Sequence, residues 1–281
     1  MFWLMLLTTA FVTAVAWWVL EKRRRATHPV PHGDQADLEF PHEQEFELYH
    51  NAHPVYESHE QIRYVADFAP EGAQSLVPED SALRAEMEEW IDRSSLTEHP
   101  LNNADKTAGN AIPGQALPLF CTMVEKVPYL RIFEGLLFHF DRLRPLLFIV
   151  LKLRGIENIH KIAPAAQVIA ATRRHMAGHL DALEARLEKS GGPWILGDQY
   201  TLADVSWLVI FERMRQADSE GVFFSEANRP LGAAYWQRLR QRPAYAEAIL
   251  AHSHPLIEYG RQRIGDAKAS SADVRICLEG R

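Results

Sequence analysis

Apolar residues recur every three or four positions in several stretches of this chain. The first stretch spans residues 83–91 and follows a proline and two acidic residues at 78–80, a start that suits a helix N-terminus. Further apolar stripes run over residues 169–187, 201–215 and 236–250. This spacing is typical of amphipathic helices, so the pattern predicts a mainly α-helical bundle.

Only residues 46–56 favour β-structure. Two short runs there, FELYH and PVY, flank two residues that suit a turn, which predicts a hairpin. Helix breakers recur in residues 22–43, after a basic start, and in residues 95–114, so we expect a tether and a long surface loop. The last residues are rich in alanine, serine and charged side chains, and they predict a flexible tail over 263–281.

The first 20 residues contain no charged side chain, and about 20 residues are needed to cross the hydrocarbon core of a bilayer. They end near Trp17 and Trp18, an aromatic pair typical of the membrane interface, and the basic residues 22–25 follow. A cleaved signal peptide and a buried core helix are the alternatives. Because basic flanks stay on the cytoplasmic side, the sequence predicts a single-pass membrane protein, anchored by residues 1–21, whose remaining chain faces the cytoplasm.

A second apolar and aromatic stretch, residues 127–153, is interrupted by charged side chains. Charges near the middle of a membrane are costly, so this stretch is not expected to span one. Three interpretations remain for it. It forms a long buried helix, it lines a pocket for a small apolar ligand, or it rests on a membrane surface.

Charge and cysteine content exclude several classes of function. The net charge of −7 provides no basic field for phosphate backbones, so nucleic-acid binding is not expected. Cys121 and Cys277 lie far apart, which argues against a disulfide framework and a cysteine zinc cage. His175 and His179 have the i, i+4 spacing of helical zinc ligands, but no third ligand is identifiable, so no metal site is predicted.

Thr201 and Asp204 stand at the start of the helix predicted over residues 201–215. The Thr201 hydroxyl can accept a hydrogen bond from the amide three residues on, while the Asp204 carboxylate bonds back to Thr201. This reciprocal pair is a capping box in which the shorter aspartate replaces the usual glutamate or glutamine. Both residues are therefore expected to cap the helix and not to catalyse.

The run WILGDQYTLADVSWL at residues 194–208 resembles the signature segment of the glutathione S-transferase C-terminal domain. Two further segments also resemble that domain, PEDSALRAEMEEWID at residues 78–92 and YWQRLRQRPAYAEA at residues 235–248. The resemblance implies an all-helical C-terminal domain over residues 78–262.

Residues 54–65, PVYESHEQIRYV, resemble the last strand and helix of the family's thioredoxin-like N-terminal domain. The resemblance implies a truncated remnant of that domain over residues 44–77, in which Glu57 and Ser58 bind glutathione. Ser58 at a helix N-terminus can offer its hydroxyl and free amides to a carboxylate, while Glu57 can accept an ammonium group. Alternatively, Ser58 and Gln61 form a capping box that needs no ligand.

The tyrosine, serine or cysteine with which the family stabilises the glutathione thiolate has no identifiable match, so the catalytic residue stays unknown. Tyr49, Tyr56 and Ser58 are the available substitutes, and Phe46 stands where the family has a cis-proline. The leading hypothesis is a membrane-anchored glutathione S-transferase-like protein that binds glutathione or a conjugate weakly and transfers its thiol to apolar electrophiles. The alternative is a non-catalytic protein-interaction scaffold. The anchor and a long insertion between the first and second helices of the bundle also resemble the ganglioside-induced differentiation-associated branch of the family.

Overall fold

The computed structural model describes Val15, Val19 and residues 48–50, 53–55, 58–68, 72–97, 99–138, 143–224 and 228–281. The chain divides into two units, Met1–Glu57 and Ser58–Arg281, and each is described by itself. In the first unit, β1 (Leu48–His50) and β2 (His53–Val55) form an antiparallel hairpin in which Leu48 lies opposite Val55. This hairpin falls inside residues 46–56, where two short runs around a turn predict one.

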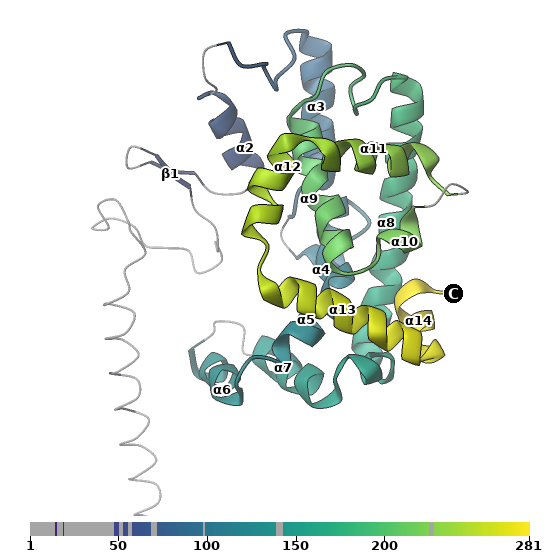
Figure 1. Cartoon of the computed structure of the whole chain (residues 1–281). Coiled ribbons are helices and arrows are strands. Elements are labelled where there is room, and N and C mark those ends of the chain that lie inside the picture. Colours follow the sequence, from purple (N-terminus) through teal and green to yellow (C-terminus); the bar gives the residue numbers. More distant parts are fainter. Residues whose placement is uncertain are drawn as a thin grey trace, which may run out of the picture. The chain divides into compact units, whose positions relative to one another are not determined.

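The second unit consists of helices and their connections (Figure 1). Its α-helices are α2 (Ser58–Ala66), α3 (Ser81–Ser94), α4 (Ala108–Gln115), α5 (Leu117–Val124), α6 (Tyr129–Phe138), α7 (Leu143–Arg154), α8 (Ala163–Ser190), α9 (Leu202–Gln216), α10 (Glu220–Phe223), α11 (Pro230–Gln241), α12 (Pro243–Ala248), α13 (Pro255–Ser270) and α14 (Ala272–Glu279). Among the described residues, short 3-10 helices join them, η2 (Pro100–Asn102), η3 (Ile156–Lys161) and η4 (Leu250–His252). The prediction of a mainly helical bundle is confirmed for this unit.

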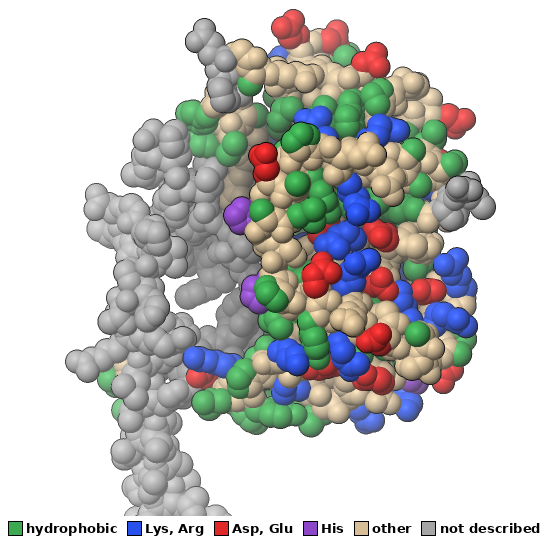
Figure 2. Space-filling view, in the orientation of Figure 1, with side chains coloured by type: hydrophobic (Ala, Val, Ile, Leu, Met, Phe, Trp, Pro, Cys, Tyr) green, Lys and Arg blue, Asp and Glu red, His purple; other side chains and the backbone are tan. Residues whose placement is uncertain are grey.

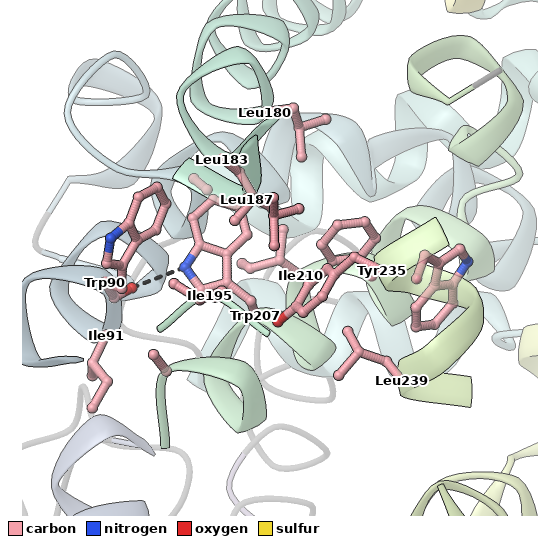
Figure 3. Packing of buried hydrophobic residues seen from close by; sticks show 14 of the residues in the cluster. Trp90, Ile91, Leu180, Leu183, Leu187, Ile195, Trp207, Ile210, Tyr235 and Leu239 are labelled. Atoms are coloured by element: carbon pink, nitrogen blue, oxygen red, sulfur yellow. Dashed lines mark hydrogen bonds between the residues drawn. The ribbon is translucent and has the colours of Figure 1, made fainter. Parts of the chain in front are cut away.

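The larger hydrophobic core surrounds α9. Its Trp207 is 1% exposed, and the indole Nε1 donates a hydrogen bond of 2.9 Å to the backbone carbonyl of Trp90 in α3. Figure 3 shows this bond, together with leucines of α8 and with Tyr235 and Leu239 of α11, which belong to the same buried cluster. The apolar stripes of four helices therefore meet in one core, as their spacing predicts.

Part of the stretch expected to be a loop, residues 95–114, is helix α4. Its glycines are points of close packing: a Cβ atom on Gly109 would lie 2.4 Å from the carbonyl oxygen of Ser94. A Cβ atom on Gly114 would lie 2.4 Å from Cγ2 of Thr172 in α8. Glycines that suggest a turn in the sequence thus let α4 approach its neighbours.

The flexible tail expected over residues 263–281 is wrong, because α13 and α14 occupy this segment. Ile264 of α13 is 1% exposed and Val274 of α14 is 0% exposed, within a second hydrophobic core. The Lys268 ammonium lies 2.6 Å from the Asp218 carboxylate and ties α13 to the segment after α9. A few apolar side chains at helical spacing are enough to order an otherwise polar, alanine-rich segment.

The predicted membrane anchor, residues 1–20, lies outside the described residues except for Val15 and Val19. Among the helices that the structure describes, none combines the length and the apolar character needed to cross a bilayer. Helix α5 is apolar but has 8 residues, whereas α8 has 28 residues but carries charged side chains along its length. This finding overturns the prediction of a single-pass membrane protein with its remaining chain in the cytoplasm.

Candidate functional site

Thr201 and Asp204 meet at the first turn of α9, and both are 0% exposed. The Thr201 N–H donates to Asp204 Oδ2 at 2.8 Å. Asp204 Oδ1 accepts two further hydrogen bonds, from the Ile195 N–H at 3.1 Å and from the Tyr235 hydroxyl at 2.9 Å. Burial raises the pKa of Asp204, although these hydrogen bonds oppose the shift, and burial also raises the pKa of Tyr235. The carboxylate thus joins a helix start, a loop and α11.

The loop before α9 turns tightly. Trp194 and Gly197 exchange backbone hydrogen bonds of 3.0 and 3.1 Å. Gly197 has a φ of +99°, in the left-handed region where glycine is favoured. The glycine of the WILGD sequence therefore serves the turn that presents the Ile195 N–H to Asp204.

Ser58 is the first residue of α2 and is exposed, whereas Glu57 lies outside the described residues. The first N–H groups of a helix have no partner within that helix, and the aligned peptide dipoles make this end positive. The start of α2 can therefore receive a carboxylate, which is the chemistry predicted for Ser58.

Arg63 fastens α2 to α3. Its Nε donates to Glu88 Oε2 at 2.8 Å, its Nη1 donates to Glu60 Oε1 at 2.9 Å, and Asp92 lies 3.5 Å away. Burial alone would lower the pKa of Arg63, but the hydrogen bond and charge of Glu88, with the other two carboxylates, raise it overall. Ile62, one residue earlier, packs against the larger core. These contacts hold α2 to the helical unit.

The segment after α2 is also attached to the start of α9. The Leu202 N–H donates to the carbonyl of Leu76 at 3.1 Å, and Gln199 Nε2 donates to the carbonyl of Ser75 at 3.1 Å. Ser58 and the Thr201–Asp204 pair therefore belong to one helical unit, although they stand on different helices.

A buried ionic cluster near the end of α9 was not found by sequence reasoning. Glu212 Oε1 accepts from Arg215 Nη2 and from Gln216 Nε2, both at 2.9 Å. Glu212 Oε2 accepts from Arg215 Nε at 2.9 Å and from the Tyr245 hydroxyl at 2.7 Å. Burial alone would raise the pKa of Glu212, but the hydrogen bonds from Arg215 and Tyr245 lower it overall. The signal in the sequence is a glutamate three residues before an arginine inside a largely apolar helix.

One histidine of the pair on α8 has a hydrogen-bonding partner elsewhere in the helical unit. His179 Nε2 lies 2.9 Å from the carbonyl oxygen of Ala104, and burial lowers the pKa of this histidine. In the part of the chain that the structure describes, no three His, Cys, Asp or Glu side chains are grouped to hold a metal ion. Cys121 is 0% exposed, and burial raises its thiol pKa to about 12, so it is not a nucleophile at neutral pH.

The protein family described as glutathione S-transferase, C-terminal domain, matches residues 166–249. The matched residues include most of α8 and helices α9 to α12. The matched range contains the Thr201–Asp204 pair, Tyr235 and the Glu212 cluster. For these residues, the match supports the resemblance that the WILGDQYTLADVSWL segment indicates.

Curated relatives match mostly short stretches of this chain. A 2,5-dichlorohydroquinone reductive dechlorinase from Sphingobium indicum is 38% identical over 68 residues, which cover 24% of this chain and 20% of the relative. The chain therefore spans about a fifth of that protein's length. Glutathione S-transferase F14 from Arabidopsis thaliana is 20% identical over 201 residues, 72% of this chain and 60% of the relative.

A solved structure extends the likeness in fold. The beta-etherase LigF from Sphingobium sp. strain SYK-6 has a TM-score of 0.55 and 20% sequence identity with this chain. The match covers 73% of this chain and 77% of that protein. The likeness in fold thus covers a larger share of the chain than the family match does.

Proposed function

We propose that this protein binds glutathione or a glutathione conjugate at the start of α2, through Ser58 and Glu57. The observation that carries the proposal is the exposed Ser58 at the N-terminus of a helix that Arg63 fastens to α3, in the unit that contains the transferase-type domain. Ser58 and the free amides of α2 would bind the ligand's terminal carboxylate, and Glu57 would bind its ammonium group. This end of glutathione is remote from its sulfur.

The reaction that the superfamily implies is attack of the glutathione thiolate on an apolar electrophile. The match to the glutathione S-transferase C-terminal domain family and the likeness to glutathione S-transferase F14 support glutathione-dependent chemistry as the class to test. The alternative function is a non-catalytic interaction scaffold that keeps the fold and has lost the ligand.

Replacing Glu57 with glutamine is expected to weaken glutathione binding by about 10-fold to 100-fold, because a hydrogen bond to a charged group contributes about 1.5–3 kcal/mol. Isothermal titration calorimetry on the full chain measures this change. Glu60→Gln is the matched control, since Glu60 lies on the same helix, is exposed and bonds to Arg63. The absence of binding heat, or an equal loss in both variants, would contradict the proposal, and the former result favours the scaffold.

Turnover with an aryl halide is expected to be at least about 100-fold below that of a competent superfamily enzyme assayed in parallel. Ser58 and Glu57 bind the amino-acid end of the ligand, so they contribute ground-state binding without stabilising the developing thiolate. Removing one preorganised donor to a reacting anion costs about 100-fold to 1,000-fold in rate. Fast turnover that is abolished by Tyr49→Phe or Tyr56→Phe would contradict this expectation. It would show that a tyrosine hydroxyl of the hairpin region stabilises the glutathione thiolate.

A further inference from the structure

The helical unit has two hydrophobic cores that meet along α8. Met176, Leu180 and Leu187, in the second half of this helix, belong to the larger core around α9. Ala165 and Ile169, near its start, belong to the second core, which also contains residues of α5, α6, α7, η3, α13 and α14. Among the described helices, α8 alone contributes buried apolar residues to both cores. The two cores are therefore separate apolar clusters that share one helix.

Polar groups and a small cavity lie at the boundary between the two cores. On α8, Thr172 stands between the two sets of apolar residues, is 2% exposed and accepts a hydrogen bond of 2.9 Å from Gln115 Nε2. Nearby, a cavity of about 10 Å³ has room for about one water molecule. Its walls come from α4, α8, the segment after α9, α13 and α14, and include Gln115, Ile169, Ser219, Ile264, Lys268 and Glu279. Atoms that line a void lack contacts on that side, so α13 and α14 are held less tightly here than by an apolar core.

Ionic contacts hold α13 and α14 across this boundary. Lys268 Nζ of α13 lies 2.6 Å from the Asp218 carboxylate and donates to the Asp218 carbonyl at 2.8 Å. The same ammonium group lies 3.1 Å from the Glu279 carboxylate of α14. Figure 1 shows α13 crossing the front of the unit, and Figure 2 shows Lys and Arg side chains beside Asp and Glu side chains on this face. Lys268 thus joins α13, α14 and the segment after α9.

Helix α13 also packs closely against α5. Gly260 of α13 is buried, and a Cβ atom there would lie 2.6 Å from Cδ1 of Leu119 and 2.6 Å from Oγ1 of Thr122. The Tyr259 hydroxyl donates to Glu125 Oε2, at the end of α5, at 3.0 Å. Departure of α13 would therefore uncover this side of α5, which belongs to the second core and not to the larger one.

We propose that α13 and α14 form a C-terminal strap that opens as one unit and exposes the second core while the larger core stays folded. Residues 250–254, which lead into α13, are all exposed, so no buried side chain fixes this connection. Isolated helices of 16 and 8 residues are marginally stable in water, so both lose order once they leave the unit. The strap adds four buried apolar residues to the second core, Ile264, Ala267, Val274 and Leu278. An element held by so few buried residues opens at a lower free energy than the whole domain.

Hydrogen–deuterium exchange of the full chain, followed by mass spectrometry, tests this proposal, which does not depend on glutathione binding. Lys268→Met is expected to speed exchange of the amides of α13, α14 and α5 by at least about 10-fold, because the partly buried carboxylates of Asp218 and Glu279 lose their shared ammonium partner. Exchange in α3 and α11, which belong to the larger core, is expected to stay unchanged.

Lys189→Met is the matched control, since Lys189 is exposed near the end of α8 and its replacement is expected to leave exchange in the second core unchanged. A second variant, Val274→Ala, removes an apolar contact in place of a charge, and it is expected to give the same pattern as Lys268→Met. Equal acceleration in α3 and α11 would show that both cores open together. Unchanged exchange in α5 would show that the strap does not cover the second core. Either result would overturn the proposal.

Discussion

Replacing Asp204 with alanine is expected to lower the free energy of unfolding by about 3–5 kcal/mol. The carboxylate accepts hydrogen bonds from Thr201, Ile195 and Tyr235, and all of these donors lie in the interior. Each buried donor left without a partner costs about 1–3 kcal/mol, and a cavity forms as well. The loss is a large share of the 5–15 kcal/mol typical of a domain, so this variant is expected to be partly unfolded at 37 °C.

Denaturant unfolding followed by circular dichroism measures this loss. Asp198→Ala provides the matched control, because Asp198 is exposed in the loop that leads to the same helix. Surface changes of this kind are usually within about 0.5 kcal/mol of the wild type. A loss below about 1 kcal/mol for Asp204→Ala would show that the loop and α11 do not depend on the carboxylate.

Replacing Arg215 with methionine is expected to cost about 3–5 kcal/mol, because the buried Glu212 carboxylate would lose its charged partner. The side chains of Arg215 and Glu212 are 9% and 6% exposed, so water cannot replace the lost hydrogen bonds freely. Arg213→Met is the control on the same helix, since Arg213 is exposed and bonds to Gln216. Thermal unfolding compares the two variants, and equal losses would disprove a special role for the buried pair.

The same pair predicts a dependence on pH. The pKa of Glu212 in the folded protein is lowered from its ordinary value of 4.5, so the unfolded chain binds this proton more readily. The stabilisation is therefore present above about pH 4.5 and is lost as the pH falls through the lowered folded value. In Arg215→Met this acid-dependent loss of stability should be much smaller. The free energy of unfolding between pH 6 and pH 3 measures the difference.

Around Asp204, the sequence could predict only the contact with Thr201. The capping pair is three residues apart in the chain, so local spacing is enough to place Asp204 against Thr201. Its contact with Tyr235 joins residues 31 positions apart, and the contact between Tyr245 and Glu212 spans 33 positions. Local patterns carry no information on such pairs, because they depend on how α9, α11 and α12 pack.

The sequence by itself determined the helical character of the second unit, the positions of α3, α8 and α9, and the likeness to the transferase C-terminal domain. Helical spacing is a local property, and the apolar stripe indicates which side of each helix is buried. Only the tertiary structure decided how glycine-rich and alanine-rich segments behave. Gly109 and Gly114 allow α4 to pack closely, and Ile264 with Val274 orders the last two helices. Whether a small residue breaks a helix or permits contact depends on the neighbour that the fold places beside it.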